Sequence, residues 1–401
     1  MAKGRFHVGV DAASWHNDRG YGRFTRELLK ALIGRDSEFR YTLIFDQAPG
    51  FELPHGCQIV VAGARQSIHE ATSGDSSRSL GDLWRAGRVA RAAGFDLFFF
   101  PTVYSYFPII KRIPCAVCIH DTTPERFPEL VFPTWRNRQL WKIKSFLARL
   151  QATRVMTISG ASAADLSTLL GIPQHKIDVV TEAPEPIFRI INDAAALSAA
   201  KSRYGVPQNA RLLVHVGGMN AHKNILGLLK AMLSVIRRFP DTHLAIVGSL
   251  SRKGFWDNVS VLQAHVRDTP PLSAHVHFTD YLSDAELVEL LNAAEALVFP
   301  SFWEGFGLPA VEAMSCGVPV LASNRSSLPE VVGDAGMFFD PEDTDDIAGT
   351  IMEFLGDMPR QAALRARAME RVKHFTWARA AELAEDCFRR TINRQAARGD
   401  G

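Results

Sequence analysis

The sequence contains no long hydrophobic run and no signal-peptide pattern. No apolar stretch in its 401 residues reaches the roughly 18 to 20 residues that a membrane-spanning helix needs. The first residues, Met1 to Phe6, lead directly into a strand-like pattern. Short-period repeats and low-complexity tracts are also missing. We therefore expect a globular protein that remains in the cytoplasm.

Cysteine is scarce, and its spacing indicates no special chemistry. The five cysteines are an odd number and lie mostly within apolar runs, which favours reduced thiols over a disulfide framework. Cys115 and Cys118 have C-x-x-C spacing, but in a strand this odd offset directs the two side chains to opposite faces. We expect neither a redox site nor a metal site there.

Charge of one sign is not in excess. With 45 Lys+Arg and 43 Asp+Glu, the net charge of +2 argues against a general nucleic-acid binder. No Asp-x-Asp pair follows a strand where it could hold a metal ion at a phosphate. Asp343-Thr344-Asp345 instead resembles a helix start, where acidic residues favour the helix dipole. The sequence therefore predicts no metal ion and no cofactor.

Apolar strand patterns alternate with helical patterns along the whole chain. Strands are predicted at 6–10, 41–45, 97–100, 115–119, 154–158 and 177–180, and then from 212 and at 243–247, 275–279, 296–299 and 318–322. Helices are predicted at 21–32, 80–92, 135–150, 161–170, 225–239, 257–266, 284–294, 308–316, 345–355, 360–373 and 377–392. This alternation predicts an α/β fold with parallel sheets covered by helices on both faces.

The length suits two domains of about 200 residues each. Pro184-Glu185-Pro186 can continue neither a helix nor a strand and is the predicted linker. We expect an N-terminal Rossmann-like domain at 1–185 and a second one at 186–376, facing each other across a cleft. A small polar loop is predicted at 71–79. In such doubly wound sheets, ligands bind beyond the carboxyl ends of the strands.

The segment from Ser301 to Met314 is the most informative about function. It places Glu304 in a glycine-rich turn after an apolar strand, and Glu312 about one turn into the following helix. Gly305 and Gly307 allow close approach to the main chain, and the helix start suits a phosphate or a sugar hydroxyl. A solvent-facing helix carboxylate is the plainer reading of Glu312, but its neighbours are mostly apolar.

A lysine follows the first strand of the second half in a similar turn. Gly217-Gly218 ends this strand, and Lys223 precedes the next helix, which delivers a flexible ammonium group near a helix N-terminus. A solvated turn lysine is the alternative. Two further motifs follow strands of the first half, namely Gly20-Tyr21-Gly22-Arg23 and His120-Asp121. Taken alone, the glycine motif fits a plain strand-to-helix turn as well as a phosphate-binding loop. A histidine after an apolar strand is by itself more often structural than catalytic, and Asp121 could simply cap the loop.

Together these segments resemble the retaining GT-B glycosyltransferases of group 1, also called family four. Glu304 to Glu312 is similar to the family's E-x7-E signature, Gly217 to Asn224 to its phosphate-binding lysine segment, and Gly20 to Phe24 to its glycine loop. Ile119-His120-Asp121 resembles its His-Asp turn, and Ser326 to Val332 and Phe375-Thr376-Trp377 are also similar to family features. The motifs span nearly the whole chain in the expected order.

The resemblance implies site roles. Glu312 would anchor the ribose of a nucleotide diphosphate sugar, and Glu304 would hold hydroxyls of its sugar, with His120 near the reacting centre. Donor-binding residues would further include Gly22, Arg23, Gly218 and Lys223, and the turn Gly305, Phe306, Gly307 and Leu308. The helix within 377–401 would return to the N-terminal domain. Many relatives carry an arginine near the lysine, where this chain has Gly217, Gly218 and His222; Arg23 could supply that charge.

The resemblance therefore predicts a retaining, metal-independent hexosyltransferase, with a weak preference for mannose from GDP-mannose. The acceptor would be a saccharide or a lipid-linked saccharide in glycan or polysaccharide assembly. Two alternatives remain at this point, a catalytically silent subunit that binds a nucleotide sugar or a partner enzyme, and a sugar-nucleotide epimerase.

One predicted helix carries an unusual charge pattern. Trp135 to Leu150 contains five basic residues, two tryptophans and no acidic residue. It could rest on an anionic membrane surface near a lipid-linked acceptor, at the inner face of the membrane. The alternative is a covering helix whose apolar stripe faces inward and whose basic face lies in water.

Overall fold

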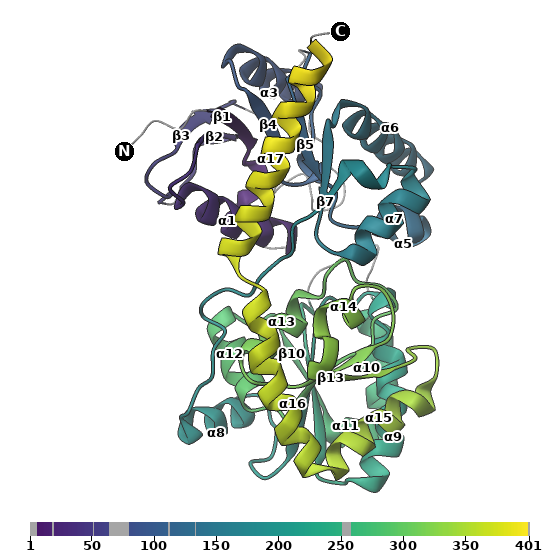
Figure 1. Ribbon diagram of the computed structural model, residues 1–401. Helices are drawn as coiled ribbons and strands as arrows, with labels where there is room; N and C mark the ends of the chain where they lie inside the picture. Colours follow the sequence, from purple (N-terminus) through teal and green to yellow (C-terminus); the bar gives the residue numbers. More distant parts are fainter. Residues whose placement is uncertain are drawn as a thin grey trace. The chain divides into compact units, whose positions relative to one another are not determined.

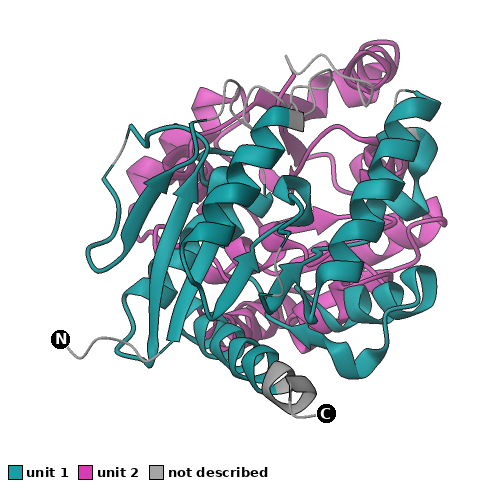
Figure 2. Cartoon of the chain, turned by 90° about the horizontal axis from the view of Figure 1, so that it is seen from above, with its two compact units in different colours: residues 1–182, 377–401 teal, residues 183–376 magenta. Residues whose placement is uncertain are grey.

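A computed structural model describes residues 6–17, 20–50, 52–63, 80–110, 113–132, 134–250 and 258–399. The chain divides into two compact units, residues 1–182 with 377–401 and residues 183–376 (Figure 2). Each unit is an α/β layer structure with a parallel sheet (Figure 1). The predicted polar loop at 71–79 lies outside the described residues.

Unit 1 contains a seven-stranded sheet with the order β3-β2-β1-β4-β5-β6-β7. Its strands are β1 (Phe6–Asp11), β2 (Phe39–Phe45), β3 (Gln58–Val61), β4 (Leu97–Phe100), β5 (Cys115–Cys118), β6 (Arg154–Thr157) and β7 (Ile177–Val179). Its helices are α1 (Gly20–Ile33), α3 (Leu80–Ala92), α4 (Thr123–Arg126), α5 (Pro128–Val131), α6 (Trp135–Gln151), α7 (Gly160–Leu170) and α17 (Trp377–Gly399). The buried sequences of the central strands, such as Leu-Phe-Phe-Phe in β4, are those of a sheet covered on both faces.

Unit 2 contains a six-stranded sheet with the order β10-β9-β8-β11-β12-β13. Its strands are β8 (Arg211–Val216), β9 (Thr242–Val247), β10 (Val276–Asp280), β11 (Ala296–Phe299), β12 (Val320–Ser323) and β13 (Gly336–Phe339). Its helices are α8 (Ala194–Arg203), α9 (Ile225–Arg238), α10 (Val259–Arg267), α11 (Pro270–His275), α12 (Asp284–Asn292), α13 (Leu308–Ser315), α14 (Leu328–Val332), α15 (Thr344–Gly356) and α16 (Met358–Arg371). The strand order reverses between β8 and β11, which is the switch point where ligands of such sheets bind.

The doubly wound α/β class predicted from the sequence is confirmed, and most predicted elements lie within a few residues of the observed ones. Strands β3 and β13 and helices α4, α5, α8, α11 and α14 were not predicted. Helix α1 begins at Gly20, so Gly22 lies in its first turn, within the predicted helix at 21–32. Gly22 packs against the preceding loop so closely that a Cβ there would lie 1.9 Å from the Asn17 carbonyl oxygen.

The C-terminal helix α17 follows unit 2 in the chain but packs on the sheet of unit 1. It contacts α1 and the strands β4 to β7. The fully buried Phe388 meets the rings of Phe39 and Phe99 edge-on, with centroids 5.8 and 5.1 Å away. Ion pairs from Arg389 to Glu38 (2.6 Å) and from Arg390 to Asp178 (2.7 Å) flank this contact. Unit 1 therefore completes its core with the last residues of the chain.

We expect Phe388→Ala to destabilise unit 1 by about 3 to 5 kcal/mol, because it leaves a cavity among buried aromatic rings. The measurement is urea denaturation followed by fluorescence and circular dichroism. Asn393→Gln, at an exposed position of the same helix, should change the free energy of unfolding by less than about 0.5 kcal/mol. Equal stability of the two variants would show that α17 contributes little to the core.

Candidate functional site

The lysine turn of unit 2 is a short 3-10 turn, not the start of the helix itself. Ala221–Lys223 forms this turn, and Asn224 then adopts a left-handed conformation (φ 53°) before α9 begins at Ile225. Asparagine tolerates such a φ better than most residues. The side-chain amide of Asn224 also donates, through Nδ2, to the Pro341 carbonyl oxygen (2.7 Å), which links the turn to the loop after β13. Lys223 is thereby held at the carboxyl end of β8.

The Glu304 turn is fastened on both sides. The Phe302 amide donates to the His222 carbonyl oxygen (2.9 Å), and the Glu304 amide donates to Ser326 Oγ (2.9 Å). Ser327 Oγ donates to the carbonyl oxygens of Glu304 (3.1 Å) and Phe306 (2.8 Å). The turns after β8, β11 and β12 thus form one connected edge of the sheet. The Ser326-Ser327 segment, noted above only as a family feature, supports the Glu304 turn.

Lys223 and Glu304 form an ion pair in this edge. Lys223 Nζ lies 2.6 Å from Glu304 Oε1 and 5.6 Å from the centre of the Phe299 ring. Both side chains are largely buried, with 15% and 10% of their surfaces exposed. Burial, the largest single effect, raises the pKa of Glu304, but the charge of Lys223, the neighbouring His222 and hydrogen bonds from Lys223 and Ser301 together lower this pKa below its usual range. Glu304 is therefore an ionised carboxylate, paired with a largely buried cation.

Glu312 lies in α13, which begins after Gly307. Gly307 has a φ of 98°, and a Cβ there would lie 2.8 Å from Leu328, so this position requires glycine. Glu312 is 3% exposed, which excludes the solvent-facing reading. Burial, assisted by the Glu312 charge, raises the pKa of the nearby Cys316 thiol to about 12. Gly218, in contrast, is exposed and lies two residues after the end of β8.

His222, which stands beside the lysine, does not replace a missing arginine charge. Burial lowers its pKa to about 4, and Lys223 acts in the same direction, so the ring is neutral at pH 7. Arg325 follows β12 at the same edge, but its guanidinium group pairs with Asp340 (3.1 Å) and Glu342 (3.3 Å). In this part of the described chain, Lys223 is therefore the cation whose side chain reaches the Glu304 turn.

His215 is a site residue that the sequence prediction missed, because it lies within an apolar strand pattern. It is fully buried on β8, next to the switch point, and Nδ1 lies 3.0 Å from the Val298 carbonyl oxygen on β11. A carbonyl only accepts, so Nδ1 carries the proton and Nε2 is a bare acceptor. Nε2 is buried without a hydrogen-bond partner and would lie 3.6 Å from a Cβ on Gly217. Burial lowers the His215 pKa to about 4.

In unit 1, the predicted His-Asp turn follows β5. His120 is 8% exposed, its Nε2 lies 3.0 Å from the Pro101 carbonyl oxygen, and its ring meets Phe24 edge-on at 4.8 Å. Burial lowers its pKa to about 4, so the ring is neutral, with Nε2 donating and Nδ1 left as an acceptor. Asp121 Oδ1 accepts from the Thr123 amide (2.8 Å), which is the loop-capping arrangement. Arg23 lies half-buried in the first turn of α1.

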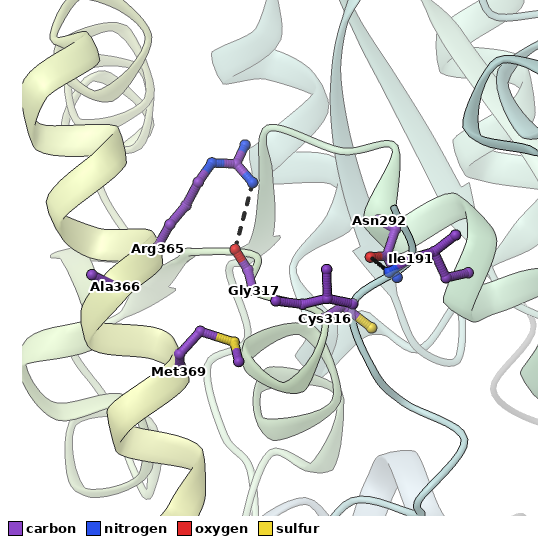
Figure 3. A pocket seen from close by; sticks show the side chains of 8 residues that line it. Ile191, Asn292, Cys316, Gly317, Arg365, Ala366 and Met369 are labelled. Carbon is purple, nitrogen blue, oxygen red and sulfur yellow. Dashed lines mark hydrogen bonds between the residues drawn. The ribbon is translucent and has the colours of Figure 1, made fainter. Parts of the chain in front are cut away.

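The structure contains a separate cavity of about 330 Å³ in unit 2 (Figure 3). Ile190, Ile191, Asn292, Cys316, Gly317, Arg365, Ala366 and Met369 line it. Gly317 precedes β12 and Asn292 precedes β11, so the cavity lies at the amino ends of the strands. It is therefore distinct from the edge that contains Lys223 and Glu304.

The described residues contain no cluster of three or more metal-ligating side chains. Among the described helices, none is both long and apolar enough to cross a bilayer. All five cysteines are free thiols, and four of them are buried.

Comparisons with known proteins now identify the family. A model described as "Glycosyl transferases group 1" matches residues 198–371, and one described as "Glycosyltransferase Family 4" matches residues 19–182. The O-antigen chain mannosyltransferase B of Escherichia coli is 33% identical over 72% of this chain and 71% of its own length. The chain belongs to glycosyltransferase family 4. Members of this family are retaining hexosyltransferases that generally need no metal ion, and their donor is a nucleotide sugar.

Further relatives support the assignment. The serotype-specific mannosyltransferase WbdA of E. coli is 30% identical over 69% of this chain, which spans only 34% of that longer protein. A solved structure of HepE from Anabaena in complex with UDP-glucose superposes with a TM-score of 0.73 over 95% of this chain and 98% of its own, at 19% identity. At this identity the similarity establishes the fold, which is GT-B, and not the donor. The family predicted from the motifs is confirmed.

The low pKa of His215 predicts how stability depends on pH. The folded pKa of about 4 lies below the ordinary value of 6.5, so the unfolded chain binds the proton first as pH falls. Stability is highest above pH 6.5 and decreases toward pH 4. His215 alone should contribute a loss of about 2 kcal/mol between pH 7 and pH 5.

The measurement is the free energy of unfolding from urea titrations at pH 7 and pH 5. The pKa values of His120 and His222 are also lowered, so both residues contribute to the loss of stability on acidification. The difference between a variant and the wild type therefore isolates the contribution of one residue. His215→Asn should lose less stability on acidification than the wild type, whereas His55→Asn, at an exposed position, should behave like the wild type. An unchanged pH dependence in His215→Asn would contradict a buried neutral imidazole.

Proposed function

We propose that this enzyme transfers mannose from GDP-mannose to a saccharide or lipid-linked saccharide acceptor in glycan or polysaccharide assembly. Support comes from the curated relatives, whose names are those of mannosyltransferases. We place the reaction in the cytoplasm, at the inner face of the membrane when the acceptor carries a lipid.

The Lys223–Glu304 ion pair at the switch point is the observation that carries this proposal. Its two charges lie 2.6 Å apart and are largely buried. A nucleotide diphosphate sugar presents negative phosphate oxygens and sugar hydroxyls in one molecule. In our assignment the diphosphate accepts from Lys223, and a sugar hydroxyl donates to Glu304. Both buried charges then keep a partner when the donor enters, which avoids the cost of an unpaired buried ion.

The remaining donor contacts are assigned to the neighbouring turns. Buried Glu312, one turn into α13, would accept from the two ribose hydroxyls. The backbone amides of Gly218 and of the turn Gly305 to Leu308, which includes Phe306 and Gly307, would meet phosphate and sugar oxygens near the positive end of the α13 dipole. From unit 1 we assign Gly22 and Arg23 to the diphosphate side of the donor.

His120 is assigned to positioning the donor sugar. The neutral ring donates through Nε2 to Pro101, so the remaining Nδ1 can only accept from a sugar hydroxyl. A ring with a pKa of about 4 carries no charge at pH 7, so His120 contributes position and not charge. A correctly held sugar lowers the barrier through orientation rather than through proton transfer by this histidine.

Transfer with retention can proceed without a protein base. The bond between the anomeric carbon and the phosphate oxygen breaks, and the acceptor oxygen bonds to the same face of the sugar. The acceptor proton passes to the leaving diphosphate, whose charge Lys223 stabilises. We assign this stabilisation to Lys223, backbone amides and helix dipoles.

The test is a donor panel with the purified protein. GDP-mannose, UDP-glucose and ADP-glucose are offered with a mannosylated acceptor, in EDTA and with Mg²⁺, and release of nucleotide diphosphate is measured. We expect turnover with GDP-mannose in both buffers. Turnover that requires added metal would contradict the metal-independent mechanism, and binding of every donor without any turnover would favour a catalytically silent subunit.

We expect Lys223→Met to weaken binding of GDP by about tenfold or more while the fold stays intact, because a charge-assisted contact to phosphate is worth roughly 1.5 to 3 kcal/mol. Isothermal calorimetry measures the affinity. Lys230→Met, on an exposed position of α9, is the matched control and should bind GDP like the wild type. Identical affinities of the two variants would remove Lys223 from the donor site.

We expect Glu304→Gln and Glu312→Gln to differ in kind. Glu304 contacts the sugar during transfer, so its loss should lower kcat far more than GDP affinity. Glu312 holds the ribose in ground and transition states alike, so its loss should mainly raise the KM for the donor. Steady-state kinetics and calorimetry with GDP separate the two effects. The assignments are reversed if Glu304→Gln loses GDP binding and Glu312→Gln keeps it.

A further inference from the structure

Helix α6 presents an apolar face to solvent. Trp135, Leu140, Ile143, Phe146, Leu147 and Leu150 form this α6 apolar face, and all but Leu147 (37%) are more than half exposed, up to 73% for Trp135. The side that packs on unit 1 carries the small residues Ser145 and Ala148, which are buried. The expectation of an inward apolar stripe is therefore wrong. The helix lies at the periphery of unit 1 (Figure 1).

The cations of α6 divide into two groups. Lys144 donates to the Tyr104 carbonyl oxygen (2.5 Å) and Arg149 to the Leu170 carbonyl oxygen (2.7 Å), so both fasten the helix to unit 1. Arg136, Arg138 and Lys142 are exposed. At about 100° per residue, Arg138 and Lys142 flank the apolar face along one side, and Arg136 lies within it near the N-terminus. The helix contains no acidic residue.

A neighbouring loop extends the apolar face. The Ile109 amide donates to Gln151 Oε1 (3.2 Å), and Gln151 Nε2 donates to the Ile109 carbonyl oxygen (3.0 Å). This two-bond contact holds the loop beside the C-terminal end of α6. The next residue, Ile110, is 75% exposed. The exposed apolar residues therefore come from two segments that the fold holds in place.

We propose that the α6 apolar face docks the enzyme on an anionic lipid bilayer, with the apolar side chains in the headgroup boundary and Arg136, Arg138 and Lys142 among lipid phosphates. A helix with an apolar face toward the outside and cations at its flank has the pattern of an interfacial helix. This inference adds to the proposed function the surface that meets a lipid-linked acceptor. It rests on the proposed function only for the nature of that acceptor.

The exposed cations of α6 disfavour a second copy of this chain as the partner that covers the α6 apolar face. Two copies that met through the α6 apolar face would bring their exposed cations together, and α6 offers no carboxylate to pair with them. A bilayer that contains phosphatidylglycerol supplies both an apolar boundary and negative charge. The proposal therefore commits to the bilayer.

The experiment is sedimentation of the full-length protein with sucrose-loaded vesicles. Vesicles of phosphatidylcholine alone are compared with vesicles that contain phosphatidylglycerol as well. We expect binding to the anionic vesicles, weakened by salt, and much weaker binding to the neutral ones. Ile143→Ser with Phe146→Ser should reduce binding by about tenfold or more. Arg138→Gln with Lys142→Gln should reduce it by about 30-fold and weaken its salt dependence.

Matched controls lie on the exposed surface of unit 2. Val261→Ser and Arg237→Gln replace an exposed apolar residue and an exposed cation, and both should bind vesicles like the wild type. Wild-type binding by the α6 variants overturns the proposal. The proposal is also overturned if the wild type does not bind vesicles and instead forms a dimer, seen by light scattering, that the α6 variants abolish.

GDP affinity and transfer to a water-soluble acceptor, measured without vesicles, should be unchanged in the α6 variants. Failure of the donor assignment would instead appear in those two measurements. The two outcomes are therefore separable.

Discussion

Parallel pairing of the strands is the constraint on which the rest of this structure depends. Every described strand pair in both sheets is parallel, so all strands of a sheet end at the same edge. Segments far apart in sequence, such as those around Lys223, Glu304 and Ser326, thereby become neighbours. Hydrogen bonds between the turns then join them into one support. The helices, packed on both faces, leave this edge as the place where polar groups can gather.

The Lys223–Glu304 ion pair illustrates what this support makes possible. Removing two charges from water costs more than a simple ion pair usually returns, so the pair is weak evidence for a contribution to stability. Its geometry depends on the backbone bonds from Phe302 and Glu304 and on the left-handed Asn224, which place the two side chains before any ligand is present. The site is therefore preorganised by the fold.

The fold class and the site motifs could be predicted from the sequence because their signals are local. Buried parallel strands are continuous apolar runs. Lys223 and Glu304 stand in glycine-containing turns, and Glu312 stands in a helix whose start is marked by glycine and proline. Strand β3 was missed because it is short and mostly exposed at the sheet edge. Helix α8 was missed because its alanine and serine residues give no strong apolar stripe.

Other features depend on contacts between distant residues. Nothing local to β8 distinguishes His215 from a core residue, because the Val298 carbonyl on another strand determines which of its ring nitrogens carries the proton. The outward direction of the α6 apolar face depends on how tightly Ser145 and Ala148 fit the sheet, which composition does not determine. Likewise, the need for glycine at position 22 follows from the Asn17 carbonyl oxygen, which would lie 1.9 Å from a Cβ there.

The pairing of Lys223 with Glu304 also bears on selectivity and turnover. The Lys223–Glu304 pair carries no net charge, so it attracts small anions less than an isolated lysine would. Inorganic phosphate or a free sugar could pair with only one of the two charges and would leave the other without a partner. On the proposed roles, the intact donor satisfies both. Once the sugar has left, the carboxylate regains the ammonium, and this competition helps to expel the spent nucleotide before the next cycle.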